Sequence, residues 1–181
     1  MTVDECIKGR RSIRQFTEKT VSHDLLAKIV EEASYAPSWK NSQITRYIAV
    51  EGELKDKIAL ECTSSYAKNG EIIKNAPMLI ALTFVKNRSG FERDGSFSTP
   101  KEGGWQMFDA GIAAEAFCLS AYRHGLGTVI LGIFDEAKAT SLLDIPDSNE
   151  LCALIPIGYP AENPVAPKRK AVEELLSYKT Y

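Results

Sequence analysis

The sequence APMLIALTFV at residues 76–85 is the longest nearly apolar stretch of the chain. Its length of about ten residues is half of the ~20 that a membrane-spanning helix needs. An uninterrupted apolar run of this length is typical of a strand that is buried on both faces. The run therefore predicts an interior strand of a sheet.

The segments around this strand carry helical or strand periodicity. Residues 22–35 have apolar side chains at helical spacing, with Ser22 as the N-cap and Pro37 just past the end. Residues 109–124 form a more apolar helix pattern, whose small residues indicate close packing on several sides. The other expected elements are a short strand at 46–50, a polar helix at 53–67 with Leu54, Ile58 and Leu60 as its apolar positions, a strand at 127–134, a short helix at 136–143, a strand at 151–157, and a tail at 168–178 with helical spacing.

Helices arranged around a few non-adjacent strands favour an α+β fold. The chain has 181 residues and a mass of 20.0 kDa, and no linker or repeat divides it, so we expect a single domain over residues 1–181. Residues 86–104 contain Gly and charged residues that break every periodicity. Long loops of this kind are typical of mobile covers over functional sites.

Charge and cysteine content exclude several function classes. The formal net charge is −2, so no bulk basicity recruits nucleic acid or an anionic membrane. The start MTVDE has acids where a signal peptide is basic and then apolar, which predicts a cytoplasmic protein. The cysteines Cys6, Cys62, Cys118 and Cys152 lack metal-binding spacing, so we expect reduced, mostly buried thiols and no metal site.

Two common catalytic patterns are also disfavoured. A nucleophilic hydrolase needs an oriented base, but His23 and His124 both stand at expected helix ends, where structural roles are more common. The sequence GLG at 125–127 resembles part of a dinucleotide fingerprint. It follows a helix and opens a strand, however, so it is better interpreted as a helix C-cap.

Three polar clusters remain, and together they indicate a flat, phosphorylated cofactor. The first, GRRSIRQF at 9–16, offers arginine forks and a hydroxyl for a phosphate group. The second, APSWKNSQ at 36–43, carries amides and hydroxyls suited to the edge of a heterocycle. The third, PKRK at 167–170, is a second basic cluster in an otherwise acidic chain.

These clusters resemble the motifs of the FMN-dependent nitroreductase family, in the family's order and approximate spacing. The resemblance rests on RRSIRxF at 10–16, APSxxNxQ at 36–43, DAGIAAE at 109–115, GLGT at 125–128, and IGYP at 157–160 followed by a basic tail. It implies a central, mostly antiparallel sheet enclosed by helices. It also implies an intertwined homodimer with two FMN sites at the subunit interface, the helix at 109–124 and the C-terminal extension 160–181 being candidates for that interface.

The resemblance also assigns the site residues. The arginines and serine of the first cluster, joined by the late basic residues, surround the phosphate and ribityl chain. The second cluster contacts the flavin, in part from the partner subunit, and a backbone segment lies near flavin N5. The residues around the phosphate and ribityl chain are Arg10, Arg11, Ser12, Arg14, Lys168 and Arg169. Those that contact the flavin are Pro37, Ser38, Asn41 and Gln43, and the backbone near N5 belongs to Leu131 and Gly132.

No titratable catalytic residue is expected, because the flavin itself transfers hydride. Arg14 is the candidate for electrostatic support of the negative charge that reduced FMN carries near N1 and C2=O. Trp39 and Trp105 are more often interior or interface residues than lids. Residues 44–46 depart from the family pattern, and Arg46 brings an extra charge toward the pocket rim.

The implied function is an FMN-dependent oxidoreductase that takes hydride from NADH or NADPH in a ping-pong cycle. Its expected acceptors are nitroaromatics, quinones or enones. A flavin enzyme of another reaction type, such as dehalogenation or flavin fragmentation, and a flavin-binding regulatory module stay open as alternatives. The sequence leaves the physiological acceptor, the preferred nicotinamide, and one- or two-electron chemistry undetermined.

Overall fold

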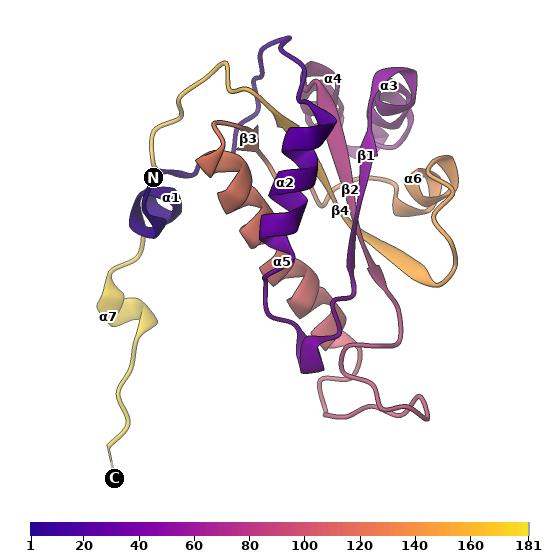
Figure 1. Ribbon diagram of the computed structural model, residues 1–181, viewed down its shortest axis with the longest axis vertical. Coiled ribbons are helices and arrows are strands. Elements are labelled where there is room, and N and C mark those ends of the chain that lie inside the picture. The colour runs from indigo at the N-terminus through magenta and orange to yellow at the C-terminus, as the bar shows by residue number, and fades with distance from the viewer. Residues whose placement is uncertain (181) are drawn as a thin grey trace.

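A four-stranded antiparallel sheet forms the centre of the molecule (Figure 1). The computed structural model describes residues 1–180. The strands are β1 Thr45–Val50, β2 Met78–Val85, β3 Gly127–Thr128 and β4 Asn149–Gly158, in the order β1-β2-β4-β3. Strand β2 lies between β1 and β4, and its residues 78–84 are all buried. The predicted interior strand and the α+β class are thereby confirmed.

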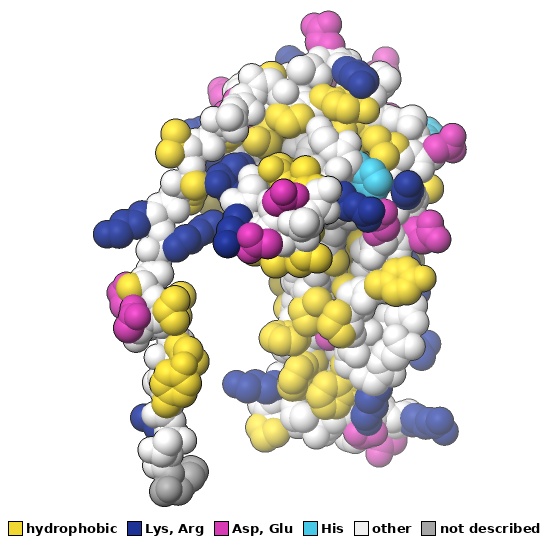
Figure 2. All heavy atoms as spheres, turned by 60° about the vertical axis from the view of Figure 1, so that its left-hand side comes forward, with side chains coloured by type: hydrophobic (Ala, Val, Ile, Leu, Met, Phe, Trp, Pro, Cys, Tyr) yellow, Lys and Arg dark blue, Asp and Glu magenta, His cyan; other side chains and the backbone are white. Residues whose placement is uncertain are grey.

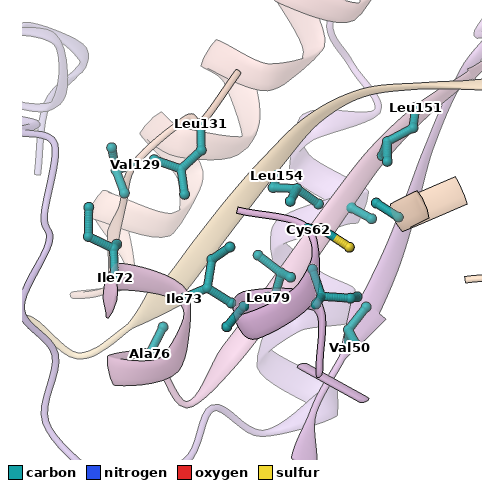
Figure 3. Close-up of a cluster of buried hydrophobic side chains, with 14 of the residues drawn as sticks. Val50, Cys62, Ile72, Ile73, Ala76, Leu79, Val129, Leu131, Leu151 and Leu154 are labelled. Atoms are coloured by element: carbon teal, nitrogen blue, oxygen red, sulfur yellow. The ribbon is translucent and has the colours of Figure 1, made fainter. Parts of the chain in front are cut away.

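Alternate residues of β2 enter two separate hydrophobic cores, one on each face of the sheet. Leu79 and Ala81 belong to the core that Figure 3 shows, together with Ile73. Met78, Ile80 and Leu82 belong to the other core, which includes Phe117. Side chains of a strand alternate between faces, so a run that is apolar at every position requires helices on both sides.

Helices supply those two layers. α2 (His23–Ala33) and α5 (Gly104–Arg123) cover one face, while α3 (Gly52–Glu61), α4 (Ala67–Asn75) and α6 (Glu136–Leu142) cover the other (Figure 1). The remaining helical segments are α1 (Val3–Gly9), α7 (Val172–Leu175) and the short 3-10 turns η1 (Trp39–Asn41) and η2 (Ser64–Tyr66).

The helix predicted at 22–35 is confirmed, including its cap: the Ser22 hydroxyl accepts a hydrogen bond from Leu25 N–H. The helix predicted at 109–124 is also present, but it begins earlier, at Gly104. The glycine pair at 103–104 suggested a break. Instead, Gly104 occupies the first helical position, where a missing side chain costs little.

The helix predicted at 53–67 is wrong in its extent and in two of its apolar positions. It ends at Glu61, and a second helix, α4, follows. Ile58 is buried, but Leu54 and Leu60 are 40% and 79% exposed. The two helices cross closely at Gly70, where an added Cβ would lie 2.6 Å from the Ala59 carbonyl oxygen. The absence of a side chain at Gly70 therefore permits α4 to pack closely against α3.

The strand predicted at 127–134 is also too long. Only Gly127–Thr128 pair with β4 as a strand, and a single bridge joins Leu131 to Leu154 further on. In the tail, only residues 172–175 are helical, and the chain from residue 165 to 180 is exposed. Figure 1 shows this tail leaving the sheet and running past α1, away from the body.

Within residues 1–180, none of the helices combines the length and apolar character needed to span a bilayer. All four cysteines are free; three are buried and Cys152 is partly buried. In the same part of the chain, no group of His, Cys, Asp and Glu side chains is placed to hold a metal ion.

Candidate functional site

The arginine-rich segment after α1 is fixed by backbone contacts to the edge of the sheet. Ile13 N–H donates to the Thr128 carbonyl over 2.9 Å, and Phe16 N–H donates to Asn75 Oδ1 over 2.7 Å. The side chains of Ile13 and Phe16 are buried. These two anchors turn inward, so the residues between and before them remain partly or fully exposed.

The polar side chains of this segment are held locally and leave donors free. Arg11 donates to the carbonyls of Lys8 and Arg10, and Arg14 donates to the Ser12 carbonyl over 3.2 Å. Arg10 Nε is buried without a hydrogen-bond partner within residues 1–180, and the nearest carboxylate oxygen, Glu115 Oε1, is 3.6 Å away. The Ser12 hydroxyl likewise makes no hydrogen bond to the described part of the chain.

Arg14 opens onto a pocket of about 450 Å³ whose other wall is the backbone after β3. Leu131 and Gly132, both predicted site residues, line that wall. The pocket is completed by residues that the sequence analysis missed: Tyr66, Lys68, Asn69, Ile72, Val129, Ile130 and Ile133.

Asn69 is the most informative of the missed residues. It is 5% exposed, and its amide donates to the Ile133 carbonyl over 2.9 Å, which holds the 131–133 backbone against α4. Because α4 was not predicted, nothing in the sequence separated Asn69 from an ordinary loop asparagine. A buried asparagine beside exposed backbone N–H groups provides donors and acceptors for the edge of a planar ring.

The second predicted cluster, residues 36–43, is a strained turn held by a buried carboxylate. Lys40, Asn41 and Gln43 all have positive φ, at 46°, 54° and 46°. Asp109 Oδ2 of α5 accepts from Trp39 N–H over 3.0 Å and lies 3.4 Å from the Ser42 hydroxyl. Left-handed backbone costs about 1 kcal/mol or more per non-glycine residue, so this shape persists only because the surroundings impose it.

Side-chain contacts within the turn place its other polar groups. The Ser38 hydroxyl accepts from Gln43 N–H over 3.0 Å, and the Gln43 amide donates to Asn41 Oδ1 over 3.1 Å. Pro37, Ser38 and Gln43 line a mostly apolar groove of about 580 Å³ beside α2 and β1.

A single chain does not bring the three clusters together. Arg14, Leu131 and Gly132 share one pocket, whereas Pro37, Ser38 and Gln43 line the groove beside α2 and β1. Asn41 lines neither of these two pockets. Lys168 and Arg169 are exposed on the tail, which Figure 2 shows hanging clear of the body. The convergence of all three groups around one cofactor therefore stays a prediction that requires a second subunit.

Comparison with known proteins identifies the class to which this fold and these clusters belong. Residues 7–159 match the model of the nitroreductase family. The chain belongs to this family, as the motifs indicated.

Individual relatives agree with this membership. A protein of Methanothermobacter thermautotrophicus, provisionally named NADH dehydrogenase/NAD(P)H nitroreductase, is 31% identical over 168 residues, covering 91% of this chain and 80% of its own. The crystal structure of a nitroreductase family protein from Clostridium novyi is 35% identical, with a TM-score of 0.76 over 90% of this chain and 87% of that one. A structure from Desulfovibrio desulfuricans, described as a nitroreductase in complex with FMN, is 26% identical with a TM-score of 0.78, covering 100% of this chain and 98% of that one.

Proposed function

We propose that this protein is an FMN-dependent NAD(P)H oxidoreductase that acts as a homodimer, in the cytoplasm, on nitroaromatic, quinone or enone acceptors. The observation that carries the proposal is the pocket between Arg14, Asn69 and the 131–133 backbone. The arginine-rich segment that leads to Arg14 adds the buried Arg10 Nε and the Ser12 hydroxyl, neither of which has a hydrogen-bond partner within residues 1–180. The relatives support it, because one is named for NAD(P)H chemistry and another was solved with FMN.

The donors that line this pocket, together with those of the arginine-rich segment before it, fit FMN. A buried Arg10 Nε without a partner carries an unmet hydrogen bond, which costs about 1–3 kcal/mol and which a phosphate oxygen would satisfy. The Ser12 hydroxyl, two residues further along the chain, adds a second donor. Next to Arg14, the Asn69 amide and the Lys68 ammonium offer polar contacts of the kind that the pyrimidine edge of a flavin requires.

The other half of the site comes from the partner under this proposal. The 37–43 residues lie in a different region of the same chain, so a second subunit must supply its own copy of them. Exposed apolar side chains provide a surface for that contact: Met107 and Phe108 on α5, Ile130 and Ile133 beside the pocket, and Val172, Leu175 and Tyr178 on the tail. Figure 2 shows hydrophobic side chains both on the tail and on the body across from it. Association with a second subunit would remove these apolar side chains from water.

FMN, when bound, supplies the chemistry by accepting hydride from NAD(P)H and passing the electrons to the acceptor. The chain supplies binding and electrostatics. Arg14 and Lys68 place positive charge at the pocket, which stabilises an anionic reduced ring. The N–H groups of Gly132 and Ile133 donate to no other group of residues 1–180 and can orient the ring by hydrogen bonding.

The proposal is tested on the purified protein in two steps. We expect a yellow protein that releases FMN on denaturation, whose absorbance bleaches anaerobically with NADH or NADPH and returns when a quinone is added. A colourless protein that takes up no added FMN contradicts the proposal. Bound FMN that stays oxidised with both nicotinamides would instead indicate a flavin-binding module without turnover.

A further inference from the structure

A second pocket lies on the other side of the 36–43 turn and is unusually rich in cationic side chains. It has a volume of about 730 Å³, between the turn, the start of β1 and the loop that follows β2. Its lining includes Lys40, Arg46, Arg88 and Arg93, against Glu92 as the one carboxylate. The protein as a whole carries a net charge of −2, so this concentration of positive charge is a local feature.

Two of these cations have no partner in the described chain. Lys40 is paired with Glu92, at 3.2 Å between Nζ and Oε1, and Arg46 donates to the carbonyls of Gln43 and Thr45. Arg88 and Arg93 make neither an ion pair nor a side-chain hydrogen bond with residues 1–180. The pocket therefore presents two uncompensated guanidinium groups, each with a donor fork that matches carboxylate or phosphate oxygens.

The backbone that carries Arg88 is held on both sides. Ser89 is fully buried and its hydroxyl donates to Asp109 Oδ2 over 2.6 Å, while Asn87 N–H donates to Gln106 Oε1 over 2.6 Å. Gly90 has φ +83°, and a Cβ there would lie 2.7 Å from the Glu102 carbonyl oxygen. Arg88 consequently extends from an anchored base, which lowers the entropy cost of binding with it.

The pocket also adjoins the proposed flavin-contacting turn. Trp39 and Ser42 line this pocket, while Ser38 and Gln43 line the groove on the other side. The same carboxylate, Asp109, bonds to both walls, through Trp39 N–H and the Ser89 hydroxyl. A group bound by the arginines would thus sit next to the part of the chain that faces the ring under the proposed function.

We propose that this pocket binds a carboxylate or phosphate group on a compound that exchanges electrons with the flavin, with Arg88 and Arg93 as the recognising residues. This inference rests on the proposed function and gives the partner's chemical class. Two sources share the chemistry: the 2′-phosphate of NADPH, or an acidic acceptor such as a nitroaromatic carboxylate.

The test compares anionic with neutral compounds of the same shape on the FMN-loaded enzyme. The acceptor arm measures kcat/KM for 4-nitrobenzoate against 4-nitrobenzyl alcohol, and the donor arm measures NADPH against NADH. We expect Arg88→Gln and Arg93→Gln to lower the anionic-to-neutral ratio roughly three- to tenfold in one arm, and that arm identifies the source. The control Lys101→Gln removes a charge from the same loop outside the pocket, and should leave both ratios within about twofold.

A binding measurement separates this inference from the proposed function. Because Trp39 lines the pocket, its fluorescence should change on titration with benzoate or 2′-AMP, compounds that accept no electrons, and less with benzyl alcohol or adenosine. That response should weaken in the arginine variants even if the protein bound no FMN. Unchanged ratios in both arms for the Arg88→Gln/Arg93→Gln double variant, or an equal fall in Lys101→Gln, would overturn the inference.

Discussion

At the scale of single residues, Asp109 holds more of the candidate site together than any of the side chains predicted to bind FMN. One of its oxygens accepts from Trp39 N–H and the Ser89 hydroxyl and lies near the Ser42 hydroxyl. It is 3% exposed, so removing it would strand buried donors. We expect Asp109→Ala to lower the free energy of unfolding by about 2–4 kcal/mol, and Asp109→Asn by less, measured by urea denaturation.

The turn at 36–43 should also relax from its left-handed backbone in Asp109→Ala, so FMN affinity should fall together with stability. The exposed Asp147, which makes no side-chain hydrogen bond within residues 1–180, provides the matched control. If Asp147→Ala and Asp109→Ala had equal, small effects, Asp109 would have no anchoring role.

The sequence motifs predicted some residues of the candidate site and missed others. The motifs located Arg14, Leu131 and Gly132, which do share a pocket. Asp109 stands at the start of the motif at 109–115, but the motif gave it no role, and Asn69 lies in none of the motifs. Each acts through contacts between elements distant in sequence, to Trp39 and to Ile133. Such contacts depend on tertiary packing and leave no periodic signal along the chain.

Among the elements, α2 and α5 are joined by a carboxylate whose contribution depends on pH. Glu32 accepts from the Ser120 hydroxyl over 2.7 Å and pairs with His124 and Arg123. The Ser120 hydrogen bond, then the bond to His124, hold the pKa of Glu32 below its ordinary value of 4.5. A lowered folded-state pKa stabilises the protein fully above pH 4.5, and the contribution disappears as pH falls below that value.

We therefore expect Glu32→Gln to reduce stability by roughly 1–2 kcal/mol near neutral pH. The difference in Tm from the wild type should shrink as pH is lowered below 4.5. The control is Glu31→Gln, because Glu31 directly precedes Glu32 and is exposed. This variant should change Tm little at any pH. A Tm difference for Glu32→Gln that stays constant down to acid unfolding would contradict this linkage.

The short strand β3 fixes the arginine segment through a close approach at Gly127. An added Cβ there would lie 2.5 Å from Ile13 Cγ1 and 2.7 Å from Ile13 Cβ. Overpacking of this kind costs about 1–3 kcal/mol, and relief requires Ile13 to move, with Ser12 and Arg14 beside it. We expect Gly127→Ala to lower both stability and FMN retention, measured by thermal denaturation and by flavin release on dialysis.

Gly104→Ala is the matched control, because nothing lies within 4 Å of a Cβ at that position. A Gly127→Ala variant as stable and as yellow as Gly104→Ala would show that β3 does not position the arginine segment.

The accuracy of the sequence analysis at this scale follows the strength of each periodic signal. The buried strand β2 and the amphipathic helix α2 were predicted well, because their apolar residues recur at regular positions along the sequence. The α3–α4 pair was misread as one helix because the break between them, at residues 62–66, contains neither Gly nor Pro. The strand predicted at 127–134 was too long, because beyond β3 the segment pairs with β4 only through the isolated bridge at Leu131.

For the whole molecule, the structure shows one chain with an extended tail and with the Arg14 pocket and the 37–43 turn in separate places. The side of α5 near Met107 and Phe108 is exposed, and the tail from residue 165 to 180 has no buried residue. Ordering an exposed tail costs entropy that one chain does not recover. A second subunit that packs against α5 and contacts the tail would bury these surfaces. The same arrangement would bring the 37–43 turn of each subunit to the Arg14 pocket of the other.

Subunit mixing shows whether each FMN site is shared between two subunits. One variant, Arg14→Ala, impairs the arginine half, and another, Ser38→Ala/Gln43→Ala, impairs the turn half. We expect each alone to bind little FMN, while the two co-expressed variants together recover FMN in about a quarter of all sites, because a mixed dimer contains one intact site. If the mixture bound no more FMN than the separate variants, each site would lie within a single chain, and the account of a shared site would be wrong.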